Sequence, residues 1–124
     1  IENATNDGAN WRELISPWLK DEIEHDVFNP VVATRKIISN LTNSQFREMK
    51  ETNPKKYKNL IRQIIDIDIK AVVEESDYLI VYWNKSVFKG GGTHGEITLA
   101  YYLKKPIYLV NHVPLDDLSS WIFS

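Results

Sequence analysis

The chain has 124 residues, a formal net charge of −2 at pH 7, 43% hydrophobic residues and no cysteine. This length and hydrophobic content predict one globular domain spanning residues 1–124. Because the chain has 17 acidic and 15 basic side chains, it lacks the excess of positive charge that binds nucleic-acid polymers or membrane surfaces. The polar N-terminus and the lack of a long apolar stretch predict a cytoplasmic protein without a membrane partner.

Both ends of the sequence are abrupt. It opens at Ile1 without a strand and closes at Ser124, directly after the apolar run Trp121 to Phe123. We therefore expect a first strand upstream of the given residues and a further C-terminal segment downstream.

The first part of the chain alternates helical patterns with one short run of extended character. Apolar residues recur at helical spacing from Trp11 to Ile23, which predicts an amphipathic helix with a kink at Pro17. The run His25–Asn29, stopped by Pro30, is a strand candidate.

Two more helices are expected before the middle of the chain. Residues 34–51 have a weak helical periodicity. After Pro54, apolar residues from Tyr57 to Val72 form a long stripe that predicts a strong helix.

The second half contains a strand, a glycine-rich turn, a helix and a second strand. The strands are expected at Tyr78–Trp83 and Ile107–Val110, with the helix passing through Leu99 to Leu103. This βαβ order predicts a doubly wound parallel sheet of the flavodoxin or Rossmann type, with helices on both faces. Such sheets bind ligands beyond the carboxyl ends of their strands, which places the expected site between Asn84 and Glu96.

The turn segment Gly90–Glu96, GGGTHGE, carries the most chemistry. Glycines allow the backbone to approach a ligand, and the first helical amides favour negative charge. One interpretation is structural, since Thr93 as N-cap and Glu96 as N3 match a capping box. The other makes Glu96 a reactive carboxylate, because three consecutive glycines exceed what a helix start requires.

Asp68 falls within the apolar stripe of the long helix, among Ile64, Ile65 and Val72. A carboxylate there is costly unless it is paired or lines a cavity, which suggests a polar contact on a pocket wall. Alternatively, the helix ends before Asp68, or its side chain bonds a neighbouring backbone amide.

His94 is a candidate proton donor beside Glu96, although a histidine in a first helical turn is more commonly a surface residue. His25 and His112 share no ligand spacing with it, so no metal site is expected. The sequence contains no Walker motif and no nucleophilic serine or cysteine arrangement, and no cofactor is expected.

Six segments occur in an order that resembles the nucleoside 2-deoxyribosyltransferase-like family. They are WREL at 11–14, FNP at 28–30, DIKAVVEESDYLIVYWN at 68–84, GGGTHGEITLA at 90–100, KKPIYLV at 104–110 and SSW at 119–121. The resemblance covers nearly the whole chain, and only the ordered set is specific. It implies an enzyme that acts on the N-glycosidic bond of a nucleoside or a nucleoside 5′-monophosphate.

The resemblance also implies roles for individual residues. Glu96 matches the family's nucleophile, and Asp68 matches its aspartate before the strand, although it stands one residue further from the strand than is usual. Further substrate contacts are expected from the turn and the helix start, namely from Asn84, Gly91, Gly92, Thr93 and His94. Helix-terminal amides are expected to keep Glu96 ionised near neutral pH.

The family's C-terminal polar segment reaches into the pocket of a neighbouring subunit, and it matches Asp117 to Ser120. Asp117 and Ser120 are therefore expected to bind substrate across the interface of a homo-oligomer. One departure concerns the aspartate that transferases of the family place ahead of the glutamate. Phe88, Lys89 and Gly90 stand there instead, which favours hydrolysis over base transfer.

Two rival functions stay open at this stage. The glycine-rich segment also resembles that of nucleotide phosphoribohydrolases with the lysine-decarboxylase-like fold. Proteins of that family are usually longer and have a catalytic arginine upstream of the segment. In this chain, no arginine follows Arg62. The other rival is a nucleotide-binding or sensor module without turnover.

Overall fold

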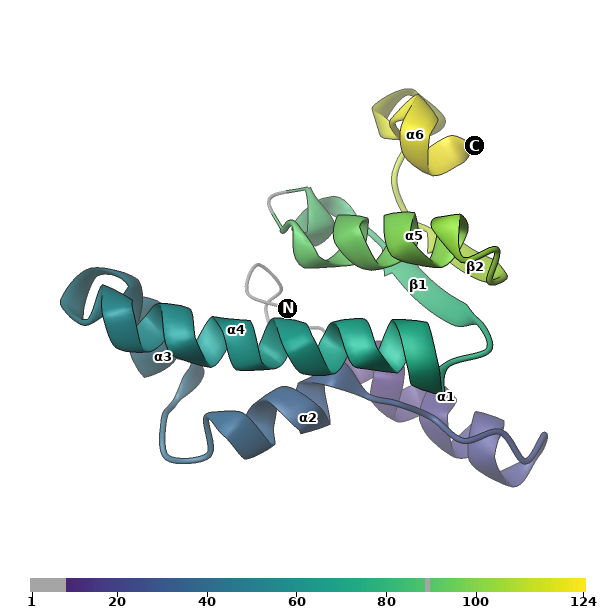
Figure 1. The fold of residues 1–124 in the computed structure, drawn as a ribbon. Helices are drawn as coiled ribbons and strands as arrows, with labels where there is room; N and C mark the ends of the chain where they lie inside the picture. The colour runs from purple at the N-terminus through teal and green to yellow at the C-terminus, as the bar shows by residue number, and fades with distance from the viewer. Residues whose placement is uncertain (1–8, 89) are drawn as a thin grey trace.

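The computed structural model describes residues 9–88 and 90–124. The longest helix is α4 (Pro54–Lys70), which continues into a π-helical turn, η1 (Ala71–Glu75). Near the start of α4 pack α2 (Pro30–Ile37) and α3 (Asn43–Thr52), while α5 (Gly92–Tyr102) and the sheet lie near its end (Figure 1).

The sheet has two parallel strands, β1 (Leu79–Trp83) and β2 (Ile107–Asn111), in a register that pairs Leu79 with Ile107 and Trp83 with Asn111. Helix α5 connects them, so the predicted βαβ unit is confirmed. Around this unit lie three short helices: η2 (Lys85–Val87), η3 (Leu115–Asp117) and α6 (Ser120–Phe123).

The two faces of the sheet have different neighbours. On one face, Val81 and Trp83 of β1 pack with Ile97 of α5 in the buried core. On the other face, Tyr82 stacks on Trp11 of α1 (Ala9–Asp21), with 5.7 Å between the ring centroids. The α1 helix therefore covers part of the second face, where Tyr108 remains 59% exposed.

The prediction of a doubly wound sheet with helices on both faces is wrong, because the described residues form a sheet of only two strands. The strand candidate His25–Asn29 does not pair with β1. Its last residue, Asn29, is the N-cap of α2. The Asn29 side chain accepts a hydrogen bond from the Val31 amide, 3.0 Å away, and Pro30 is the first residue of the helix. The segment runs beside β1 without forming a ladder, and a cavity lies between them.

The two strongest helix predictions, those for α1 and α4, are confirmed. Helix α1 contains Pro17 as expected, and α4 begins at Pro54 behind the N-cap Asn53. The single weak helix predicted over residues 34–51 is wrong, because two helices occupy this region. A capping box between Thr42 and Gln45 starts α3 and separates it from α2.

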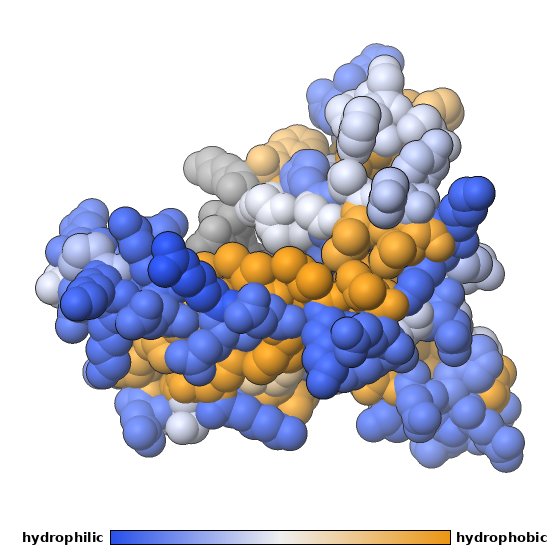
Figure 2. Space-filling model, viewed as in Figure 1, coloured by the Kyte–Doolittle hydropathy of each residue, from blue (hydrophilic) through white to orange (hydrophobic). Residues whose placement is uncertain are grey.

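Apolar residues also remain on the surface of α4, where Figure 2 shows an orange band along the helix. Ile65 and Ile69 are each 45% exposed, and Val73 follows at the next helical step with 38%. Among the described residues, no helix has the length and apolar content needed to cross a membrane.

Candidate active site

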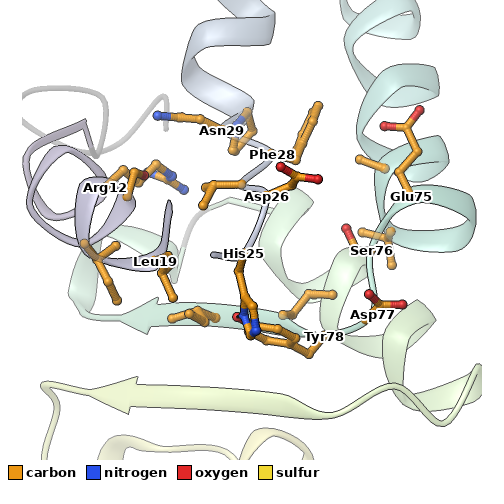
Figure 3. A pocket seen from close by; sticks show the side chains of 18 of the residues that line it. Arg12, Leu19, His25, Asp26, Phe28, Asn29, Glu75, Ser76, Asp77 and Tyr78 are labelled. Carbon is orange, nitrogen blue, oxygen red and sulfur yellow. The ribbon is translucent and has the colours of Figure 1, made fainter. Parts of the chain in front are cut away.

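A cavity of roughly 670 Å³ lies beside the unpaired edge of β1. Helix α1 and residues 24–30 form one side, the end of α4 with η1 forms the opposite side, and Tyr78 lies beside His25 (Figure 3). The cavity exists because the segment after α1 stays extended without hydrogen-bonding to the sheet.

Asp68 and Glu96 both line this cavity, although they come from different helices. Asp68 lies one helical turn before the buried residues Ala71 and Val72, which confirms that it belongs to the inner face of α4. Glu96 lies in the second turn of α5. Gly92 lies beside its carboxylate, since a Cβ added at Gly92 would stand in ordinary contact with the Oε1 atom of Glu96, at 3.9 Å.

Arg12 of α1 is a third charged residue in the cavity, and the sequence analysis did not select it. Its guanidinium interacts electrostatically with both Glu96 and Asp68, while burial lowers its pKa below the ordinary value. The carbon of the guanidinium lies 4.7 Å from the ring centroid of Trp11. Helical spacing places Arg12 on the same side of α1 as Ile15 and Leu19, so its inward position was present in the pattern.

The cavity perturbs the acidity of both carboxyl groups. Burial, and then the charge of Asp68, raise the pKa of Glu96 to about 7 against the opposing effect of Arg12. Burial also raises the pKa of Asp68 to about 6, again opposed by Arg12. The expectation that helix amides keep Glu96 ionised is therefore wrong in direction, because burial and the second carboxylate dominate.

Asp68 also has an unsatisfied oxygen. Its Oδ1 atom is buried and has no hydrogen-bond partner within the part of the chain that is described. Buried polar atoms without a partner are rare in proteins, and catalytic sites are one of the places where they occur. The alternative in which Asp68 bonds a neighbouring backbone amide thus does not describe this oxygen.

The capping-box interpretation of Glu96 is also wrong. Helix α5 begins at Gly92 with Gly91 as its N-cap, and no side chain makes a capping hydrogen bond there. Glu96 therefore stands two residues beyond the N3 position. It is free of the structural role that a capping box would give it.

The other predicted site residues in the turn do not line the cavity. His94 is held by its neighbours: its Nδ1 atom lies 2.8 Å from the Gly90 carbonyl oxygen and its ring packs edge-on against Trp83. Asn84 caps η2 by accepting a hydrogen bond from the Ser86 amide, 2.9 Å away. Gly91 and Thr93 lie at the start of α5, outside the cavity.

The predicted C-terminal residues also lie elsewhere. Asp117 ends η3 and Ser120 begins α6, and neither lines the cavity. The indole Nε1 of Trp121 donates a hydrogen bond to Thr98 on α5, 3.4 Å away, so α6 rests against the outside of α5. Lys89, in the stretch that replaces the family's aspartate, lies outside the described residues.

Among the described residues, no group of three histidine or acidic side chains is arranged to hold a metal ion. Comparisons with models of protein families, with curated proteins and with solved structures found no match to this chain.

Proposed function

We propose that this protein is an enzyme that cleaves the N-glycosidic bond of a nucleoside or nucleoside 5′-monophosphate. The observation that supports the proposal best is the meeting of Asp68 and Glu96 with Arg12 in one cavity. Glycoside-cleaving sites commonly use two carboxyl groups in one cavity, of which one carries a proton and the other is ionised.

In the proposed mechanism, the ionised carboxylate of Glu96 attacks the anomeric carbon. The carbon–nitrogen bond breaks, its electrons pass to the base, and a glycosyl ester forms on Glu96. Asp68 in its protonated form donates a proton to the leaving base. Arg12 opposes the rise of the Glu96 pKa and so increases the fraction that can act as nucleophile.

The coupled pair also allows a second assignment of roles. Burial raises the pKa of both carboxyl groups, and the charge of Asp68 also acts on Glu96, so either member of the coupled pair can be the one that keeps the proton. In this alternative, Glu96 protonates the base and Asp68 forms the ester or activates water. Both assignments use the same pair, and the residue that carries a trapped sugar distinguishes them.

Water is the proposed acceptor of the sugar. The stretch that includes Phe88 and Gly90 supplies no carboxylate to handle an incoming base. We therefore propose that hydrolysis competes with base transfer or exceeds it, and that the protein acts in the cytoplasm, where small nucleosides and nucleotides are available.

A homo-oligomer is part of the proposal. Trp121 and Phe123 of α6 are 70% and 69% exposed, and the aliphatic band of α4 adds a second apolar surface (Figure 2). Exposed apolar surfaces of this kind favour association between copies.

The test of the function is incubation with nucleosides and nucleoside 5′-monophosphates, with ribose and with deoxyribose, followed by chromatography for free base. Release of base that is lost in Glu96→Gln supports the enzyme. Tight binding without release would instead identify a nucleotide-binding or sensor module. Adding an excess of acceptor base to the same reactions compares exchanged nucleoside with free sugar.

A further inference from the structure

Four carboxylates besides those of Asp68 and Glu96 line the cavity, and we call the part that they surround its opening. Glu24 and Asp26 line it from the segment after α1, and Glu75 of η1 and Asp77 just after η1 line it from the other side. All four carboxylates are exposed to solvent. Figure 3 shows Asp26 on one side and Glu75 and Asp77 on the other. The opening of the cavity is therefore acidic on both sides.

Positive charge does not balance this part of the cavity. Among the described residues that line it, Arg12 is the one lysine or arginine, and it is engaged with Asp68 and Glu96. Outside the lining, Lys70 forms an ion pair with Glu75 at 3.8 Å, which leaves Glu24, Asp26 and Asp77 to set the charge of the opening. In the cavity as a whole, six carboxyl groups outnumber the one guanidinium among the described lining residues, so a phosphate group bound anywhere in it would meet net repulsion and a cation net attraction.

Aromatic rings lie in the same part of the cavity. Tyr78 and Phe28 both line it, and Phe28 is 38% exposed. The Tyr78 hydroxyl lies 2.6 Å from the Nδ1 atom of His25, which fixes the ring beside the opening. Aromatic faces next to carboxylates are a common setting for flat cationic groups, because the ring quadrupole and the negative charges attract the cation together.

We infer that the preferred substrates are N-glycosides without a phosphate whose base carries a positive charge, such as pyridinium nucleosides. The inference rests on the proposed function and narrows its substrate class. The charged base would lie among Tyr78, Asp26 and Asp77, and the sugar would extend to Asp68 and Glu96.

A cationic base suits this cavity chemically as well. When its bond to the anomeric carbon breaks, the electron pair neutralises the ring nitrogen and the base leaves without needing a proton. The glycosyl ester is then hydrolysed by water, which releases the sugar and one proton. Substitution of the proton donor, which is Asp68→Asn in the first assignment and Glu96→Gln in the second, should therefore reduce cleavage of a neutral purine nucleoside much more than cleavage of a pyridinium nucleoside.

The experiment compares kcat/KM for nicotinamide riboside, its 5′-monophosphate and inosine. At low salt, kcat/KM for the riboside should exceed kcat/KM for its monophosphate by about tenfold or more. This ratio of the two kcat/KM values should decrease as added salt screens the charges of the opening. The double variant Asp26→Asn/Asp77→Asn should lower the same ratio several-fold. Glu48→Gln/Glu51→Gln removes two carboxylates from α3, away from the cavity, and should leave the ratio unchanged.

The results separate this inference from the proposed function. Cleavage of the monophosphate as fast as the riboside, with no salt dependence, would overturn the charge preference while leaving the enzyme in place. If no compound is cleaved, the proposed function fails, and calorimetric binding of the same three compounds still decides the preference. Tighter binding of the riboside than of its monophosphate would support it, and equal or reversed binding would overturn it.

Discussion

Asp68 of α4 and Glu96 of α5 line one cavity, and the negative charge of Asp68 lies close enough to act on the ionisation of Glu96. Burial, and then the charge of Asp68, raise the pKa of Glu96 to about 7. Two carboxyl groups in this arrangement do not ionise independently, because the second must lose its proton beside an existing negative charge. The pair therefore carries a proton at pH values where isolated carboxyl groups are fully ionised.

This coupling predicts how stability depends on pH. The folded-state pKa of Glu96 lies above its ordinary value of 4.5, so the folded protein holds a proton that the unfolded chain has already lost. The free energy of unfolding contributed by this group is therefore highest below about pH 4.5 and falls until about pH 7.

Glu96→Gln removes the carboxyl group whose ionisation lowers the free energy of unfolding between about pH 4.5 and pH 7. We expect the variant to gain about 1–3 kcal/mol over the wild type at pH 8 and little at pH 4, since one pKa unit corresponds to about 1.4 kcal/mol. Urea unfolding at several pH values measures the difference. A constant offset between the two proteins from pH 4 to pH 8 would contradict the raised pKa.

Arg12 should set the pH range of activity. Because its charge lowers the pKa of both carboxyl groups, Arg12→Gln should raise both values and move the activity profile to higher pH. We expect a loss of about tenfold or more in kcat/KM near pH 6. Arg62→Gln on the exposed side of α4 is the matched control. Carbon-detected NMR titration of the carboxyl groups reports the pKa change itself, and unmoved values would rule out this role.

Lys105 should stabilise η1, the π-helical turn that follows α4. Its Nζ donates hydrogen bonds to the backbone carbonyls of Val72, Val73 and Ser76, at 2.5, 2.8 and 2.7 Å. Methionine at this position keeps the length of the side chain and leaves these carbonyls without the charged donor. Lys105→Met should therefore lower the free energy of unfolding by about 2–4 kcal/mol.

The adjacent Lys104→Met provides the control, because Lys104 is exposed. Thermal and urea unfolding compare the two variants. Equal stability of both would show that the three hydrogen bonds contribute nothing net.

The exposed apolar surfaces predict association. Light scattering should find at least a dimer, and Trp121→Ser/Phe123→Ser should weaken it if α6 takes part. A fully active monomer at low concentration would contradict sites shared between subunits and would leave Asp117 and Ser120 without a role in substrate binding.

Local patterns predicted much of this fold, whereas its sheet was predicted incorrectly. Regular apolar spacing identified α1 and α4, and continuous apolar runs identified both strands. The run His25–Asn29 has the composition of a strand, but pairing depends on what lies beside it, and Asn29 with Pro30 instead begins α2. The composition of a short run does not show whether its residues pair with a strand or begin a helix.

The candidate site was predicted in part for similar reasons. Asp68 was found because a carboxylate interrupts an apolar helical stripe, and the structure places it in the cavity with Glu96. Arg12 was overlooked because a single arginine near the start of an amphipathic helix is usually a surface residue. The acidic residues after α1 enter the cavity through tertiary packing, which no local spacing expresses.

The central claim is that Glu96 forms a covalent ester with the sugar. The measurement is mass spectrometry of the protein after treatment with a 2-fluoro sugar nucleoside that slows turnover of the ester. The account predicts one added sugar on Glu96 in the wild type, with no adduct and activity lower by orders of magnitude in Glu96→Gln. An adduct on Asp68 would exchange the roles of the pair. A wild type that turns over substrate yet carries no adduct, together with an active Glu96→Gln, would contradict the mechanism.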